Sequence, residues 1–293
     1  MMTLNLFCSL FLAGIFLCVL GAGSPAGAAP KKVLVVTSTT GFRHSSIPTA
    51  EKVLGELAQS SGAFTVDYAR VEPSDPQFKG PDGKPDQAKV DAAIKQVLAE
   101  KMSPAALKQY DAVVFANTTG DLPLPDKQAF LDWIKSGKGF VGMHAATDTF
   151  HHFQPYLDMI GAEFKQHGPQ VEVDAINQDA ECPICRHLPA SWKVFDEIYQ
   201  FKGFDRSKVQ GLLTLDKHPN DKTPGDYPIA WRKEYGKGRV FYTSLGHRED
   251  IWDPNTPADM KRQNSKEVAA AYQQHILNGI KWALGLENPP AKR

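Results

Sequence analysis

Three histidines stand at or just after predicted strand ends, although they are far apart in the sequence: His44, His144 and His247. The carboxyl ends of parallel strands converge on one crevice in an open α/β sheet, so we expect these imidazoles to share a site. Neutral imidazoles transfer protons, and they also bind zinc and similar metals. The alternative is that each histidine is hydrogen-bonded in its own loop. Neither H-x-x-x-H nor H-E-x-x-H occurs, so a metal site would be assembled from distant segments.

The stretch KGFVGMHAATDTFHH, residues 138–152, places His144 where chemistry is expected. The apolar run Phe140-Val141-Gly142-Met143 is typical of a buried strand, and His144 follows it directly. The small residues after the histidine favour close approach of a substrate. If the chain then turns into a helix, Asp148 lies one turn beyond His144 and could orient its ring.

Further polar and aromatic residues could complete this site. Glu197 offers a carboxylate and Tyr199 a hydroxyl, and His167 is an intermediate candidate. Trp231 and Trp252 could stack on a sugar ring, although buried core tryptophans are the alternative.

The sequence lacks the motifs that are typical of several reaction classes. No G-x-S-x-G is present, and the central turn carries His144 where a hydrolase would carry serine or cysteine. No G-x-G-x-x-G follows the first strand, so no nucleotide cofactor is indicated. Lys+Arg and Asp+Glu are balanced at 33 each, which favours neither a nucleic acid nor an anionic membrane as partner.

The first 28 residues resemble a secretory signal. Leu4–Leu20 is an apolar run broken only by Asn5 and Ser9, and Ala26-Gly27-Ala28 supplies an A-x-A cleavage pattern. We therefore predict a signal peptide over 1–28 and a periplasmic or secreted mature protein with no other membrane segment. An uncleaved anchor is the alternative.

Cys182 and Cys185 remain outside that segment, spaced C-x-x-C. In an exported protein this spacing predicts a local disulfide. Free thiols are the next interpretation. A zinc site would need two more ligands, and only His187 is close in sequence.

Strand and helix patterns alternate along the chain, which predicts one α/β domain with a mostly parallel sheet and helices on both faces. The expected helices include Gln87–Glu100, Pro125–Ser136 and Val268–Leu284. The expected strands are Lys32–Ser38, Phe64–Ala69, Asp111–Ala116, Phe140–Met143, Val171–Ile176, Leu212–Leu215, Pro228–Arg232 and Arg239–Leu245.

Seven motifs from residue 32 to 286 together resemble the trehalose-utilisation (ThuA-like) family: VLVVTSTTGFRH, ANTTGDLPL, GFVGMHAATDTF, GAEFKQHGP, DEIYQF, PIAWRKEYGKGRVFYTSLGHREDIW and GIKWALG. The resemblance implies a ThuA-like domain over 30–287, followed by a C-terminal tail, 288–293. It also implies the flavodoxin-like sheet of class I glutamine amidotransferases. The residues on family motif positions are His44, Thr119, His144, Asp148, His167, Glu197, Tyr199 and His247.

The same resemblance bears on activity. His144 would occupy the turn that carries the cysteine nucleophile of the amidotransferases, so amidotransferase activity should be absent. The family is linked to sugar catabolism, including that of 3-keto-glycosides, which makes a carbohydrate the expected partner. One departure is Cys182-Pro183, where relatives usually show His-Pro.

We therefore expect an exported hydrolase or lyase acting on glycosides or keto-glycosides. His144 and His247 would act as base and electrophile, and His44, Asp148 and Glu197 would assist. A non-catalytic sugar-binding module is the alternative, and a metal-dependent hydrolase is a third possibility. In that case His44, His144 and His247 would be the metal ligands. The sequence leaves open whether a divalent metal is bound and whether the chain forms a homo-oligomer.

Overall fold

The computed structural model describes residues 29–256 and 260–289. The predicted signal peptide, 1–28, lies outside the described residues, as do residues 290–293 of the predicted tail. Among the described helices, none combines the length and hydropathy needed to cross a bilayer.

A nine-stranded mixed sheet organises the chain, and five of its strands run parallel in the order β2-β1-β3-β4-β11. Strands β1, β3 and β4 are buried on both faces over nearly all of their length, as expected for the inner strands of a parallel sheet. The parallel strands are β1 (Lys31–Val36), β2 (Phe64–Ala69), β3 (Ala112–Ala116), β4 (Gly139–Met143) and β11 (Gly238–Thr243).

The other four strands extend the sheet in antiparallel fashion, in the order β10-β9-β6-β7 after β11. They are β6 (Val171–Asn177), β7 (Ser191–Asp196), β9 (Gln210–Lys217) and β10 (Pro224–Tyr235). A separate antiparallel pair joins β5 (Glu163–His167) to β8 (Tyr199–Lys202). The predicted α/β class is confirmed, but the sheet is mixed because the hairpin turn after Tyr235 reverses the chain into β11.

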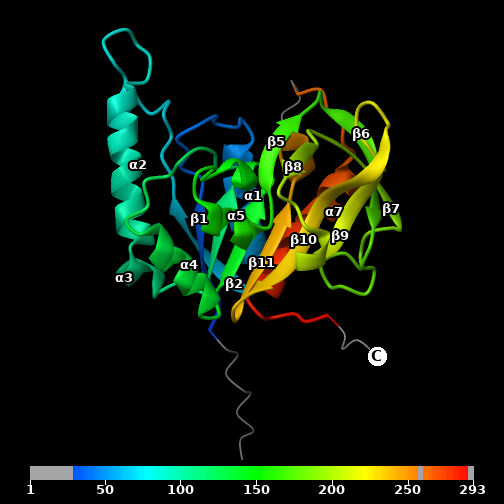
Figure 1. Cartoon of the computed structure of the whole chain (residues 1–293). Helices are drawn as coiled ribbons and strands as arrows, with labels where there is room; N and C mark the ends of the chain where they lie inside the picture. Colours follow the sequence, from blue (N-terminus) through cyan, green and yellow to red (C-terminus); the bar gives the residue numbers. More distant parts are fainter. Residues whose placement is uncertain (1–28, 257–259, 290–293) are drawn as a thin grey trace, which may run out of the picture.

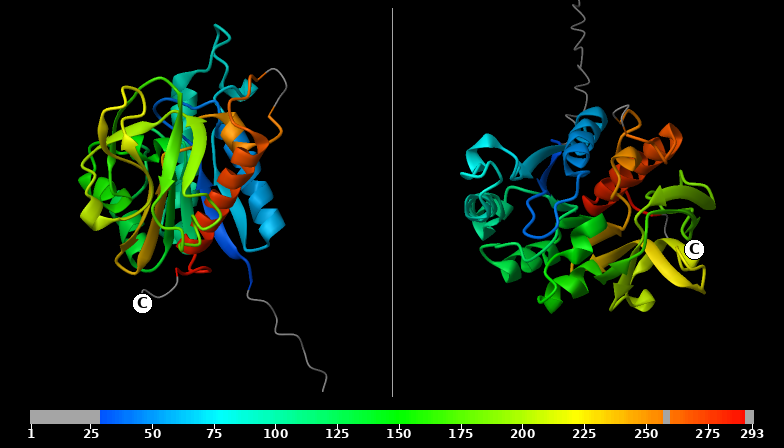
Figure 2. Two further views of the ribbon diagram at one scale, coloured as in Figure 1. Left: turned by 90° about the vertical axis from the view of Figure 1, so that its right-hand side faces the viewer. Right: turned by 90° about the horizontal axis from the view of Figure 1, so that it is seen from above.

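Helices cover both faces of the sheet (Figures 1 and 2). Buried residues of α1 and α7 share one core with one face, and those of α2, α4 and α5 share a second core with the other face. The helices are α1 (Ile47–Ser61), α2 (Gln87–Met102), α3 (Pro104–Leu107), α4 (Lys127–Lys135), α5 (Gln154–Ile160), α6 (Glu249–Trp252) and α7 (Lys266–Ala283). Single-turn 3-10 helices are η1 (Pro76–Phe78), η2 (His144–Asp148) and η3 (Arg206–Lys208).

The loops after β1, β3, β4 and β11 emerge at one edge of the sheet, because these strands are parallel. This is the upper edge in Figure 1. His44 follows β1, His144 follows β4 and His247 follows β11. The topology therefore delivers all three imidazoles to the same edge.

Candidate functional site

Four side chains from distant segments meet at this edge: His44, His144, His247 and Glu197, which follows β7. One donor atom from each lies within 4.8 Å of the others. His247 Nδ1 is 3.2 Å from His144 Nε2. The Glu197 carboxylate lies 3.3 Å from His247 Nδ1 and 3.6 Å from His144 Nε2. The ring centroid of His44 is 4.8 Å from that of His144. We call these four residues the histidine cluster.

The backbone at His144 aims its ring into the cluster. The residue directly follows the buried strand β4 and has φ of 45°, a left-handed conformation that non-glycine residues rarely adopt. Its Nδ1 lies 2.7 Å from the carbonyl oxygen of Ser244. Because a carbonyl only accepts, Nδ1 carries the proton and donates it. The lone pair of Nε2 therefore faces the cluster.

The main-chain N–H and carbonyl of Gly246 connect the segments that carry the rest of the cluster. Its N–H donates to the carboxyl of Asp196 at 2.7 Å. Its carbonyl oxygen accepts hydrogen bonds from Ser46 Oγ, Asn117 Nδ2 and Trp252 Nε1 at 2.9–3.0 Å. Ser46 lies close to His44 in the sequence, and Trp252 lies close to His247. Asp196 directly precedes Glu197. The cluster is thus held by main-chain geometry as well as by its own contacts.

Burial and mutual contact set the charges in the cluster. Burial, together with the neighbouring histidines, lowers the pKa of His44 to about 3, so this ring is neutral near pH 7. Burial raises the pKa of Glu197, but the adjacent His144 and His247 outweigh it and hold the pKa well below its usual range. Burial lowers the pKa of His247, but the hydrogen bond and charge of Glu197 reverse this and raise it. The cluster therefore holds one firmly ionised carboxylate among imidazoles.

His167 and Tyr199 border the cluster. His167 Nδ1 lies 3.1 Å from the Glu197 carboxylate, and this side chain is 43% exposed. The ring of Tyr199 is buried, and its centroid is 4.3 Å from that of His144. Solvent reaches the cluster through His167 and through His247, which is 21% exposed. Both residues predicted to contact substrate here lie beside the cluster.

The cluster can hold a divalent transition metal. Ligands bound about 2.1 Å from one ion at tetrahedral or octahedral angles are about 3.0–3.4 Å apart, close to the 3.2–3.6 Å separations among Glu197, His144 and His247. Imidazole and carboxylate donors suit zinc, iron and manganese. The hydrogen bond from His144 to a carbonyl is the outer contact that metal-bound histidines usually make. The Nδ1 atom of His44 is buried and has no partner among the described residues.

Comparison with known proteins agrees with this fold. The sequence model of the family described as "Trehalose utilisation", ThuA, matches residues 32–283. The chain belongs to the ThuA family. No curated protein matches it significantly.

Solved structures of ThuA-like proteins resemble the chain over most of its length. One from Parabacteroides merdae is 20% identical with a TM-score of 0.62, covering 90% of this chain and 93% of that one. One from Bacteroides uniformis is 21% identical with a TM-score of 0.59, covering 89% and 95%. At this identity the likeness supports the fold alone.

The predicted role of Asp148 is wrong in this ThuA-family chain. Its carboxylate lies 2.6 Å from His151 Nε2, and the other ring nitrogen of His151 is 2.6 Å from Glu163. The chain after His144 forms the 3-10 turn η2 and not an α-helix, so the residue four positions on does not lie over the ring. The carbonyl of Ser244 orients His144 instead, and no side-chain pattern in the sequence indicates a main-chain acceptor.

The predicted stacking role of the two tryptophans is also wrong. Trp231 is fully buried and donates from Nε1 to the carbonyl of Ile160 at 2.8 Å. Trp252 is equally buried and supports Gly246. Thr119 is buried as well, and its hydroxyl donates to the carbonyl of Phe42 at 2.8 Å. It supports the loop after β1 and makes no hydrogen bond to the histidine cluster.

The predicted disulfide is absent, because Cys182 and Cys185 are free, buried thiols. Burial raises the pKa of both. Side-chain amides hold this loop in place of a covalent link: Asn177 donates to the Cys185 carbonyl at 3.0 Å and Asn278 to the Pro183 carbonyl at 2.8 Å.

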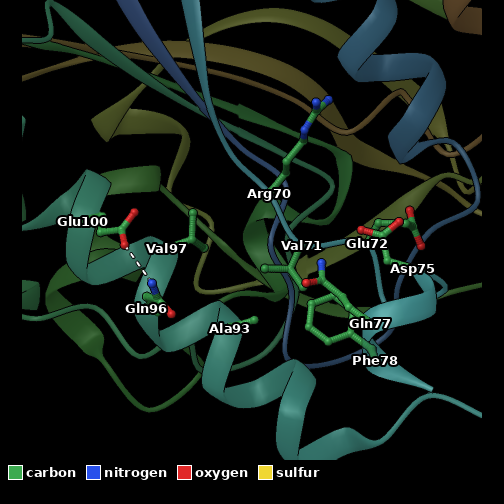
Figure 3. A pocket seen from close by; sticks show the side chains of 10 residues that line it. All are labelled: Arg70, Val71, Glu72, Asp75, Gln77, Phe78, Ala93, Gln96, Val97 and Glu100. Carbon is green, nitrogen blue, oxygen red and sulfur yellow. Dashed lines mark hydrogen bonds between the residues drawn. The ribbon is translucent and has the colours of Figure 1, made fainter. Parts of the chain in front are cut away.

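Surface hollows occur away from the cluster. Figure 3 shows one of about 320 Å³ between α2 and the segment after β2, where Gln96 and Glu100 are hydrogen-bonded. Arg70, Glu72 and Asp75 also line it, and no histidine or cysteine does. This hollow therefore adds nothing to the chemistry of the histidine cluster.

Proposed function

We propose that this ThuA-family chain is a carbohydrate-active enzyme that breaks the glycosidic bond of a keto-glycoside at the histidine cluster. The observation that carries the proposal is the convergence of His44, His144, His247 and Glu197 on one partly open point. The family description, trehalose utilisation, supports a sugar substrate.

The reaction we propose is an elimination followed by addition of water. In a 3-keto-glycoside the proton on C2 is acidic, because the adjacent carbonyl delocalises the charge left behind. Removing this proton forms a C1–C2 double bond and expels the glycosidic oxygen, which takes up a proton. Water then adds at C1, so the overall change is hydrolysis. If the intermediate is released first, the enzyme is a lyase.

His167 is the base that best fits this scheme once the cluster residues hold a metal. Its Nδ1 lies near the Glu197 carboxylate and the Gly168 carbonyl, so Nδ1–H donates and Nε2 is left to accept the substrate proton. His44, His144, His247 and Glu197 would bind a divalent metal, which supplies Lewis-acid stabilisation of the charge on the ketone oxygen. General-base help of this kind typically contributes ~10²–10⁴-fold in rate.

The strand order supports the finer fold assignment, a flavodoxin-like sheet of the class I glutamine amidotransferase type. Parallel strands β2-β1-β3-β4-β11 follow the flavodoxin order 2-1-3-4-5. His144 has the left-handed backbone of a strained turn but carries an imidazole and no thiol. We therefore propose that the chain has no amidotransferase activity.

The test is incubation with a panel of plain and 3-keto-glycosides, read by mass spectrometry, with and without added zinc or manganese. We expect product from keto-glycosides only. Because His144 would hold the metal that stabilises the developing charge, His144→Ala should lose at least ~10²-fold in turnover, whereas His152→Ala, which removes an exposed histidine, should retain it. Binding without product would favour the sugar-binding alternative, and unchanged turnover by His144→Ala would refute the assignment.

We also propose export to the periplasm or medium, based on the apolar run in residues 1–28. Fractionation of expressing cells and sequencing of the mature N-terminus test it. Full-length protein in the cytoplasm would contradict the proposal.

A further inference from the structure

Phe42 exposes an aromatic ring beside the histidine cluster. It is 67% exposed, and the only other large hydrophobic side chain exposed among the described residues is Leu286, at 46%. The centroid of the Phe42 ring is 4.9 Å from that of His44, in an edge-to-face arrangement. Exposure alone means little, since single apolar side chains are common on surfaces. The inference therefore rests on the position of this ring and on its support.

The loop that carries Phe42 is fixed to the loop after β3. Thr119 Oγ1 donates to the Phe42 carbonyl at 2.8 Å, and the N–H of Thr40 donates to the Thr119 carbonyl at 3.2 Å. A Cβ on Gly41 would lie 2.7 Å from Thr119 Oγ1, so the two loops touch too closely for a side chain there. The backbone of Phe42 is thus held in place, and its ring contacts His44 while most of its surface faces solvent.

The other side of this loop is also held in place. Arg43 forms an ion pair with Glu72 at 2.7 Å. Gly41 and Arg43 line a hollow of about 580 Å³, which leaves open space next to the loop. Neither Phe42 nor the histidine cluster lines this hollow, so the inference depends on the position of the Phe42 ring beside His44.

We propose that Phe42 is the platform on which the substrate sugar ring stacks as it enters the histidine cluster. The substrate class rests on the proposed function. Aromatic rings pack well against the C–H face of a pyranose, because that face is apolar while the hydroxyl groups point outward. A rigid ring with two side-chain torsions loses little conformational entropy on binding, which suits it to this role.

The experiment compares Phe42→Ala and Phe42→Trp with wild type, using methyl α-glucoside and its 3-keto derivative as probes. Phe42→Ala should raise KM for the keto-glucoside about 10-fold or more and leave kcat within about 3-fold, since the ring does not touch the reacting atoms. Phe42→Trp should retain KM within about 3-fold, because indole also stacks. Leu286→Ala, at the opposite edge of the sheet, is the control and should match wild type.

Saturation-transfer NMR with both probes separates this inference from the proposed function. If wild type binds a probe without turning it over, only the enzyme proposal is refuted. The stacking role of Phe42 is then tested by binding alone, and Phe42→Ala should bind the probe more weakly. Wild type that binds neither probe overturns both proposals. An unchanged KM or binding constant in Phe42→Ala overturns the platform. If that result is accompanied by a shift in oligomeric state on sedimentation, Phe42 is instead a residue of an interface between copies of the chain.

Discussion

The main-chain N–H of Gly246 donates a hydrogen bond of 2.7 Å to the fully buried carboxyl of Asp196, and this contact joins the segments that carry His247 and Glu197. Burial raises the pKa of Asp196. The carbonyl oxygen of Gly246 accepts three further hydrogen bonds. These hydrogen bonds fix the main chain that carries the histidine cluster, as a preorganised site requires.

This arrangement predicts a large cost for Gly246→Ala. Gly246 has φ of 124°, and a Cβ there would lie 2.7 Å from the hydroxyl of Tyr272 and 3.2 Å from the indole of Trp252. We expect the free energy of unfolding to fall by about 3 kcal/mol from backbone strain and overpacking together. Gly203→Ala is the matched control, because Gly203 also has positive φ but no atom within 4 Å of the added Cβ. It should cost only about 1 kcal/mol. Equal losses in denaturant unfolding would contradict the argument.

Glu197→Gln should weaken divalent metal binding. The substitution keeps the shape of the side chain but removes the only carboxylate in the histidine cluster. We expect the affinity for Zn²⁺ or Co²⁺, measured by competition with a chromophoric chelator, to fall at least about 10-fold. Glu163→Gln removes a carboxylate that contacts His151 and Lys202, outside the cluster, and should leave the affinity unchanged. The same affinity in both variants would argue against the cluster as the metal site.

The convergence of the imidazoles could be predicted from the sequence, but the contacts that orient them could not. His44, His144 and His247 follow apolar runs that form parallel strands, and topology then brings them together. Asp196 acts on a main-chain group 50 positions away, which no local pattern indicates. Asn117 could have been suspected: it follows β3 directly and has φ of 57°, a conformation that asparagine tolerates better than most residues.

The sheet, too, could be predicted from the sequence only in part. Its parallel half matched the predicted alternation of apolar strands and amphipathic helices. Strands β5, β7 and β8 were missed. Strands β5 and β8 form a short pair with few buried residues, and β7 lies at the edge of the sheet, so none of the three forms a long apolar run. The predicted stacking role of Trp231 and Trp252 was wrong for another reason: tryptophan is suited both to a hydrophobic core and to a sugar-binding site. Only burial distinguishes the two, and Trp231 is fully buried.

His275 should make the fold sensitive to acid. It is fully buried on α7, its Nδ1 lies 3.2 Å from the Ile184 carbonyl, and burial lowers its pKa to about 3. Below about pH 6.5 the unfolded chain gains a proton that the folded chain does not, so stability is lost as the pH falls toward 3.

His275→Leu removes this contribution. Between pH 7 and 5 its free energy of unfolding should fall by about 2 kcal/mol less than that of wild type. His152→Gln, at an exposed position, is the control and should follow wild type. Parallel curves for all three proteins in urea unfolding would refute the role of His275.

His151 should have the opposite effect on the pH dependence of stability: its contribution is lost as the pH rises. Its ring is held between Asp148 of η2 and Glu163 of β5, each at 2.6 Å, and Lys202 of β8 pairs with Glu163 at 2.9 Å. Burial lowers the pKa of His151, but the hydrogen bonds to Glu163 and Asp148 outweigh it and raise the pKa. A raised folded-state pKa gives stability that is fully present below about pH 6.5, and it is lost as the pH rises through the folded value.

His151→Gln should therefore lower the melting temperature most at pH 6 and progressively less toward pH 9. Because the side chain is one-third exposed, we expect a modest loss of about 1 kcal/mol at pH 6, equivalent to about 2–4 °C for a chain of this size. Melting curves at half-unit intervals from pH 5.5 to 9 measure it, with His152→Gln as the adjacent control. A difference from wild type that stays constant across this range would mean that His151 contributes through packing and not through its charge.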